Sequence, residues 1–467
     1  MTDPDESQLS SLYVELTHLE QLNDKCEMGV KLVPFPSIKN KPRTTTLNGD
    51  IIPKCSFCGG FYNKFNYNLK NAYTCSLCGS QNSTSIILDK NNPEMNDCIY
   101  DAIPQKIYNL RKQFILTEFF IISLEIVIKY PNIFDIIEEA CNNSYLNKNY
   151  GIAFLHGAIT VVKFKNTLQF QTFIEEPICK ISQLFIPKEK FCENLRDIKK
   201  QAMKLKYCFC DNVKNAIKFS MDLSLPLGTS LRFILNEGDF HSISNENCHA
   251  NSLNALKVGT QISFALFINE LKSHNPLLDF PIITGGFLRF FSSNMKDELI
   301  KNILVSLLSK PLLHDTYIYV RAPDGGCIVD YAGKGFMRTN KSISVSKIDY
   351  DQIFYFKFNI KKTNHHILQF IIFYTTDLGL KRFRVITTSI PQQYFINYEV
   401  INQYIYALIS HSLIIEGKEN TKYIVENLKK QFRSIQFDEN GLFLSYDTNL
   451  IKFYENAMRF SDEPEKI

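Results

Sequence analysis

The stretch that decides the fold lies late in the chain, at 316-TYIYVRAPDGGCIVDYAGKGFMRTNKSISVSKIDYDQIFYFKFNI-360 and 371-IIFYTTDLGLKRFRVITTSIP-391. It is rich in β-branched and aromatic residues, which are typical of strands. In its middle, four apolar side chains recur at period two and therefore share one face of a strand: Phe354, Phe356, Phe358 and Ile360. The Asp-Leu-Gly at 377–379 predicts a hairpin turn. Residues 316–391 are thus predicted to form an antiparallel β-sandwich or barrel.

Upstream of this stretch, apolar runs alternate with helical patterns. The strand-like runs are 114–128, 150–155, 159–164, 230–235 and 261–267, and the helical ones include 191–205, 213–223, 252–258 and 296–308. The run 114–128 is too short to span a membrane, carries Glu118 and Glu125, and is predicted to be a buried strand. Alternating strands and helices predict an α/β domain with a mainly parallel sheet. After residue 391 the apolar residues recur at helical spacing, which predicts a short helical C-terminal region.

The strongest chemical signal is a pair of Cys-x2-Cys turns, formed by Cys55 and Cys58 and by Cys75 and Cys78. Two such turns at this spacing can close a tetrahedron of thiolates around Zn²⁺. All four ligands would come from the protein, so the ion is expected to be structural. The alternative is four unrelated buried cysteines. Cys208 and Cys210 form only Cys-x-Cys and are interpreted as incidental thiols.

Composition excludes several functional classes. The 467 residues predict about two to four domains, and 45 % hydrophobic residues indicate a globular protein. The acidic, polar N-terminus argues against secretion, so the 13 cysteines are expected to be reduced. A net charge of +4 is small for a nucleic-acid binder. The nine histidines form no metal-binding motif, and neither a Gly-x-Ser-x-Gly elbow nor a phosphate loop occurs, so no enzymatic activity is expected.

Five segments together resemble the cargo-adaptor subunit of the inner COPII coat and, less closely, its paralogous partner subunit. They are QLNDKCEMGVKLVPF (21–35), IIPKCSFC with YTCSLCGSQN (51–58, 73–82), LFIPKEKFCENLRDI (184–198), ITGGFLRFF (283–291) and the sandwich stretch quoted above. The resemblance implies a multidomain α+β protein. Its expected domains are an N-terminal segment pairing with the β-sandwich (1–50), a zinc finger (51–88), a von Willebrand A-like α/β trunk (110–312), a β-sandwich (313–392) and a partial helical domain (393–467).

Two departures from the family are expected. Ser123-Leu124-Glu125 stands where von Willebrand A domains carry an Asp-x-Ser-x-Ser metal motif, so no metal is expected in the trunk. The chain also carries at most part of the family's helical domain and no gelsolin-like domain, and it is expected to be a C-terminally shortened member.

The resemblance implies a cargo site between finger and sandwich that binds acidic sorting signals. Of its basic positions, Lys54 and Arg321 are kept, while Gly59 and Tyr319 replace charges. Lys54 and Arg321 are therefore cargo-binding candidates, with solvated surface charges as the alternative. The resemblance also implies a basic face toward the membrane. Arg382 and Arg384, which share one face of the predicted strand 381–388, are the membrane-facing candidates, with solvated charges as the alternative.

The expected role is cargo selection in the COPII coat during ER-to-Golgi transport. The implied partners are the other inner-coat subunit in a heterodimer, cytoplasmic tails of cargo, an anionic membrane surface and, indirectly, a Sar-type small GTPase, with no nucleic acid. The expected location is cytoplasmic, peripheral on the endoplasmic reticulum membrane and COPII vesicles. Two alternatives remain open, a partner-type subunit that regulates the GTPase and a zinc-ribbon nucleic-acid-binding protein.

Overall fold

The computed structural model describes most of the chain between residues 14 and 407. The described residues are 14–21, 25–37, 46–48, 52–69, 72–83, 97–104, 116–144, 148–164, 167–173, 183–207, 228–241, 248–268, 276–323, 326–361, 367–391, 397, 400–401, 404 and 407. The chain divides into two compact units, one of Met1–Tyr108, Leu313–Ser344 and Asp349–Lys452, the other of Asn109–Leu312, Val345–Ile348 and Phe453–Ile467.

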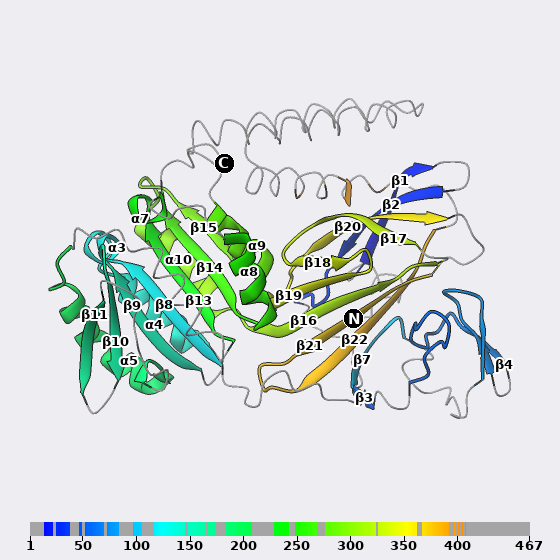
Figure 1. The fold of residues 1–467 in the computed structure, drawn as a ribbon, viewed down its shortest axis with the longest axis horizontal. Helices are drawn as coiled ribbons and strands as arrows, with labels where there is room; N and C mark the ends of the chain where they lie inside the picture. The colour runs from blue at the N-terminus through cyan, green and yellow to red at the C-terminus, as the bar shows by residue number, and fades with distance from the viewer. Residues whose placement is uncertain are drawn as a thin grey trace, which may run out of the picture. The chain divides into compact units, whose positions relative to one another are not determined.

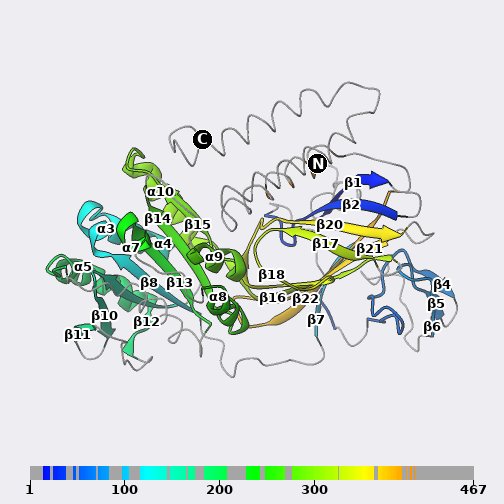
Figure 2. The same ribbon diagram turned by 45° about the horizontal axis from the view of Figure 1, so that its top comes forward.

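The second unit is built on one sheet, ordered β11-β10-β9-β8-β13-β14-β15 (Figure 1), with β12 added beside β9 (Figure 2). The strands are β8 (Thr117–Ser123), β9 (Asn149–Leu155), β10 (Ile159–Phe164), β11 (Leu168–Phe173), β12 (Ile186–Pro187), β13 (Ser230–Asn236), β14 (Gln261–Phe267) and β15 (Leu288–Phe291). β9, β8, β13, β14 and β15 run parallel, while β10 is antiparallel to β9. If β8, β9, β10, β13, β14 and β15 are numbered 1 to 6 in chain order, their order across the sheet is 3-2-1-4-5-6, which is a doubly wound arrangement. This is the α/β domain that the sequence predicts.

Helices cover this sheet. They are α3 (Leu124–Lys129), α4 (Ile133–Asn143), α5 (Lys188–Ala202), α7 (Glu237–His241), α8 (Cys248–Lys257), α9 (Asp279–Thr284) and α10 (Asp297–Ser309). α4, α5 and α10 share one apolar core with Phe120, Ile122, Ile152 and Phe154 of β8 and β9. α9 is fastened to β14, where the Ile262 N–H donates to Thr284 Oγ1 over 2.9 Å.

The prediction of one strand over 114–128 is wrong beyond Ser123. β8 ends at Ser123, opposite Leu155 at the end of β9, so no strand partner continues past this point. The chain turns there into α3, whose Glu125 and Lys129 form an (i, i+4) ion pair of 2.5 Å. The apolar residues Leu124, Ile126 and Val127 still become buried, but from a helix.

Besides the small sheet β4-β5-β6 of the cysteine-rich segment (Tyr67–Leu69, Ala72–Thr74 and Gln81–Ser83), the first unit contains two sheets. One is ordered β18-β19-β16-β21-β22-β7-β3 and the other β1-β2-β20-β17 (Figure 2). The strands are β1 (Val14–Gln21), β2 (Lys25–Leu32), β3 (Thr46–Asn48), β7 (Ile99–Ile103), β16 (Leu312–Arg321), β17 (Cys327–Ala332), β18 (Phe336–Thr339), β19 (Ser342–Asp349), β20 (Phe354–Lys361), β21 (Ile367–Thr375) and β22 (Lys381–Ser389). β2 pairs with β20 over its whole length, so the N-terminal segment completes the smaller sheet.

The two sheets meet through aromatic side chains. Phe354, Phe356 and Phe358 of β20 are fully buried, as their period-two spacing predicts. The rings of Phe356 and Phe358 lie 5.9 and 6.4 Å from that of Phe370 on β21. The predicted hairpin is also present, since β21 and β22 pair from Ile367 opposite Ser389 to Thr375 opposite Lys381. The arrangement is a β-sandwich.

Of the predicted C-terminal helical region, the structure describes residues 397, 400–401, 404 and 407, which are helical from 400 onward. Val400, Ile401 and Tyr404 are buried, and the Tyr404 hydroxyl donates to Asp330 Oδ2 over 2.9 Å. The other residues of 393–467 lie outside the described part of the chain, as do Cys208, Cys210 and the predicted helix 213–223. No helix among the described residues is long and apolar enough to cross a membrane.

Candidate metal centre and the adjoining basic residues

Each Cys-x2-Cys pair lies in a tight turn of the same design. In the first turn the Cys55 N–H donates to Gly60 O (2.8 Å) and the Gly59 N–H donates back to Cys55 O (2.9 Å). The second turn repeats both bonds between Cys75 and Ser80 (2.9 Å) and between Gly79 and Cys75 (2.8 Å). Gly59 and Gly79 have φ of 69° and 71°, a left-handed conformation that favours glycine. This repetition explains why the motif points two thiols at one place from each turn.

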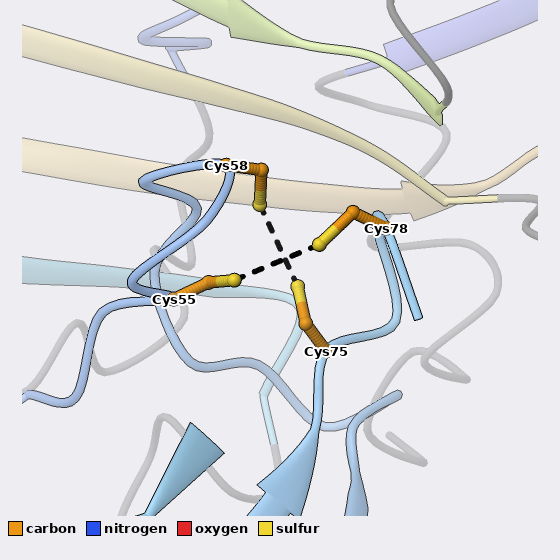
Figure 3. Close-up of side chains that lie close together, drawn as sticks. All are labelled: Cys55, Cys58, Cys75 and Cys78. Carbon is orange, nitrogen blue, oxygen red and sulfur yellow. Dashed lines mark hydrogen bonds between the residues drawn. The ribbon is translucent and has the colours of Figure 1, made fainter. Parts of the chain in front are cut away.

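The four sulfur atoms converge on a common centre (Figure 3). Cys55 Sγ lies 3.6 Å from Cys78 Sγ, Cys58 Sγ lies 3.6 Å from Cys75 Sγ, and all four lie within 4.8 Å of one another. Bonds of about 2.3 Å to a tetrahedral zinc ion would place the sulfurs about 3.8 Å apart. The cluster therefore has the donor set and the dimensions to hold one metal ion.

Polar groups surround the sulfurs. Ser80 Oγ lies 3.1 Å from Cys55 Sγ and 3.0 Å from Cys78 Sγ. Asn82 Nδ2 donates to Cys55 Sγ and the Gly60 N–H donates to Cys58 Sγ, each over 3.4 Å. Such donors stabilise thiolates and orient them toward a metal. The hydrogen bond between Cys75 and Cys58 lowers the pKa of Cys58 and raises that of Cys75, so without an ion Cys58 is the first of the two to ionise. Sequence reasoning missed Ser80 and Asn82, although both directly follow the second turn.

The finger is fixed to the larger sheet of the sandwich by reciprocal hydrogen bonds. The Phe61 N–H donates to Gln369 Oε1 (2.8 Å), and Gln369 Nε2 donates back to Phe61 O (3.0 Å). The Tyr100 hydroxyl of β7 donates to Tyr62 O (2.8 Å), and the ring of Phe61 lies 4.7 Å from that of Phe383 on β22. The finger and the strands β7, β21 and β22 thus share one hydrophobic cluster. The sequence offered no signal for Gln369, because its partner is a distant backbone group.

Both cargo candidates lie beside the first cysteine turn. Lys54 is exposed, with Nζ 4.6 Å from the centre of the Phe61 ring. A Cβ placed on Gly59 would lie 3.4 Å from an Arg321 guanidinium nitrogen, so the arginine lies against the first cysteine turn. Arg321 pairs in register with Gln369, the residue that holds Phe61. Its Nε–H is buried and has no hydrogen-bond partner among the described residues.

The prediction that Arg384 faces a membrane is wrong, because its charged group is buried and paired inside the protein. Arg384 is 9 % exposed, and its guanidinium makes a bidentate pair with Asp101 of β7, with Nε–Oδ1 of 2.7 Å and Nη2–Oδ2 of 2.8 Å. It also donates to Pro34 O (2.9 Å) and lies 4.4 Å above the ring of Phe35. The segment after β2 covers this face of β22, which alternation alone cannot reveal. Arg382 is half-buried and stays a candidate.

At Ser123-Leu124-Glu125, where no metal site is expected, the Glu125 carboxylate makes hydrogen bonds within the protein. Glu125 accepts hydrogen bonds from Lys129 and from Asn236 at the end of β13. In the described residues, the four cysteines are the one group of three or more His, Cys, Asp or Glu side chains arranged to share an ion.

Known proteins resemble this chain in both sequence and fold. Residues 314–393 match the family model of the Sec23/Sec24 beta-sandwich domain. The "Protein transport protein SEC24" of Dictyostelium discoideum is 25 % identical over 162 residues, 33 % of this chain and 15 % of the relative. The crystal structure of the human COPII-coat protein Sec24c superimposes with a TM-score of 0.74 at 13 % identity, over 90 % of this chain and 68 % of that one. The chain is Sec24-like.

The likeness to Sec23/Sec24 proteins in the sandwich sequence and in the fold confirms the resemblance found in the motifs. The aligned part of this chain spans less than a sixth of the Dictyostelium relative. A von Willebrand factor type A protein from Catenulispora acidiphila also aligns over 86 % of this chain and 79 % of that one, at 7 % identity. That alignment has a TM-score of 0.44. The doubly wound strand order of the trunk is given by its own strand pairing.

Proposed function

We propose that this Sec24-like chain selects cargo for the COPII coat in ER-to-Golgi transport and works without catalysing a reaction. The observation that carries the proposal is the sandwich match over residues 314–393, joined to a fold that follows Sec24c over 90 % of the chain. On this proposal the chain binds the other inner-coat subunit as a heterodimer and meets the Sar-type GTPase only through it. It would act in the cytoplasm, peripherally on the endoplasmic reticulum membrane and on COPII vesicles.

The proposed ion at the four cysteines is one structural Zn²⁺. The support is chemical, because a tetrahedral all-sulfur set suits zinc and leaves no ligand position open for a reacting molecule. Cys55 and Cys75 are buried, while Cys58 and Cys78 are half-buried. Bound there, the ion would hold both turns together and so fix the finger that carries Phe61 and Lys54.

The proposed cargo contact is the pair Lys54 and Arg321. A carboxylate bound beside Gly59 could accept a hydrogen bond from Nη2 of Arg321, the guanidinium nitrogen that lies against this glycine. Lys54, whose Nζ lies 4.6 Å from the centre of the Phe61 ring, would add a second charge. Each adaptor would bind a cargo tail weakly. Many adaptors on one membrane would together bind the cargo tightly enough to retain it. Arg382 remains a candidate for a basic surface facing the anionic cytoplasmic leaflet.

The test is recruitment of the chain to vesicles. The chain, the Sec23-type subunit and a Sar-type GTPase loaded with a non-hydrolysable GTP analogue are mixed with vesicles that display an acidic cargo tail. We expect the amount of the chain that sediments with the vesicles to rise when all three proteins are present, and to rise more with the tail than with a tail whose acids are amidated. Recruitment that ignores the tail would contradict cargo selection.

The second candidate function is a partner-type subunit that regulates the GTPase, which the shared sandwich family model favours as much as the first. A GTP-hydrolysis assay separates the two. A cargo adaptor alone leaves the hydrolysis rate of the Sar-type GTPase unchanged, whereas a partner-type subunit raises it. The nucleic-acid alternative predicts binding that weakens steeply with salt, which a filter-binding titration measures.

A further inference from the structure

One apolar side chain of the finger projects into solvent. Phe57, between Cys55 and Cys58, is 81 % exposed, the largest value for a large hydrophobic residue in the described chain. Scattered exposed apolar residues are normal on protein surfaces. Phe57 differs because its backbone belongs to a turn that is tightly fixed on both sides.

Hydrogen bonds hold the turn that carries this side chain. The Ser56 N–H and Oγ both donate to Asn82 Oδ1, over 2.8 and 2.9 Å. On the other side the Gly59 N–H donates to Cys55 O (2.9 Å). The backbone at Phe57 therefore cannot swing inward without losing these bonds, and the ring is held away from the finger's own core.

The finger that carries Phe57 has positive charges and no negative ones. The finger, residues 51–88, contains Lys54, Lys64 and Lys70 and no aspartate or glutamate. Lys54 is exposed three residues before Phe57, and the Arg321 guanidinium lies against Gly59 two residues after it. An aromatic ring next to positive charges fits a surface that is apolar inside and negatively charged outside.

We propose that the first cysteine turn inserts Phe57 into the interfacial region of an anionic lipid bilayer. Aromatic side chains favour this region, and neighbouring lysines and arginines gain from anionic headgroups. A lipid surface is favoured over a peptide because the ring protrudes, so a fluid bilayer can close around it. The insertion goes beyond the proposed cargo contact and needs neither cargo nor the partner subunit. Its failure would thus leave the proposed function standing.

The chain contains no tryptophan, which allows a direct test. Phe57→Trp places one fluorophore at the turn, and phosphatidylcholine vesicles with roughly one third phosphatidylserine are added. We expect a blue shift of the emission and quenching by lipids brominated near the headgroup, and no change with phosphatidylcholine alone. The matched control is Leu299→Trp on α10, at a residue that is 49 % exposed and follows Asp297 and Glu298. Its emission is expected to stay unchanged.

Co-sedimentation of the otherwise native chain with the same vesicles gives the second readout. Phe57→Ser should weaken binding roughly tenfold, through lost apolar burial. Lys54→Ala should weaken it roughly fivefold, through the lost charge. The bound metal, measured per chain, checks that each variant keeps its finger. The proposal is overturned if the emission of Phe57→Trp does not shift, if both tryptophans shift equally, or if an acidic peptide without vesicles produces the shift.

Discussion

Arg384 on β22 and Asp101 on β7 face each other across neighbouring strands and form a bidentate ion pair that is almost closed to solvent. The same guanidinium donates to Pro34 O, so one side chain joins two strands of the larger sheet to the segment that follows β2. The arginine thereby ties the N-terminal segment to a strand 350 positions later in the chain. Its role is to hold the sandwich together.

Breaking this pair should destabilise the sandwich strongly. Arg384→Ala leaves the Asp101 carboxylate buried without its partner, which costs about 3–5 kcal/mol of unfolding free energy. Urea unfolding, followed by circular dichroism, measures the change. Arg382→Ala, on the same strand but half-buried, is the matched control and should cost no more than about 1 kcal/mol. Equal midpoints for the two variants would show that the Arg384 pair is not structural.

The cysteine cluster should bind one zinc ion per chain and depend on it for folding. Zinc contributes on the order of 10 kcal/mol to small modules of this kind. Elemental analysis of the purified chain should give one zinc, and Cys75→Ser should lose it and expose the finger to protease. Cys192→Ser, which removes a half-buried thiol of α5, should keep the ion. A native chain that stays folded and free of metal would refute the zinc assignment.

The α/β unit should lose stability in acid through Glu118. Burial opposes ionisation of this carboxylate, but Lys148 at 3.1 Å and Arg232 at 2.6 Å outweigh burial and lower its pKa to about 2. Because the pKa of Glu118 is lower in the folded chain than its ordinary value of 4.5, the ionised carboxylate stabilises the fold at pH values above 4.5. This stability is lost as the pH falls toward 2. The loss amounts to roughly 3 kcal/mol at most.

Chemical unfolding between pH 5 and about 2 measures this effect. Glu118→Gln should be less stable at neutral pH, and its stability should change less across the same range. The control is Glu193→Gln, on an exposed stretch of α5, which should follow the native curve. A Glu118→Gln curve parallel to that of the native chain would contradict the role given to this carboxylate.

Reversing the two cargo charges should weaken tail binding. Lys54→Glu with Arg321→Glu should lower the affinity for an acidic cargo tail by at least tenfold, since each charged hydrogen bond is worth about 1.5–3 kcal/mol. Fluorescence anisotropy with a labelled tail gives the dissociation constant. Lys64→Glu with Arg289→Glu changes the charge equally at two other places and should bind normally. If the first double variant binds like the native chain, the two residues form no cargo pocket.

The sequence predicted features that depend on spacing. The period-two pattern of β20 fixed which residues face the core, and the two Cys-x2-Cys turns located the four sulfurs, because both depend on short-range geometry. Features set by distant contacts could not be predicted. Alternation placed Arg384 on one face of β22, but only the fold reveals that Asp101 and Phe35 cover that face. Gln369 was missed for the same reason.

The likeness to Sec24 is most directly tested by the mass of the complex that the chain forms. The chain and a Sec23-type subunit are purified separately, mixed, and passed through size-exclusion chromatography with light scattering. The proposed function predicts one peak with the mass of one copy of each, in which this chain contributes its 54.0 kDa. Two separate peaks at the masses of the individual proteins would contradict it.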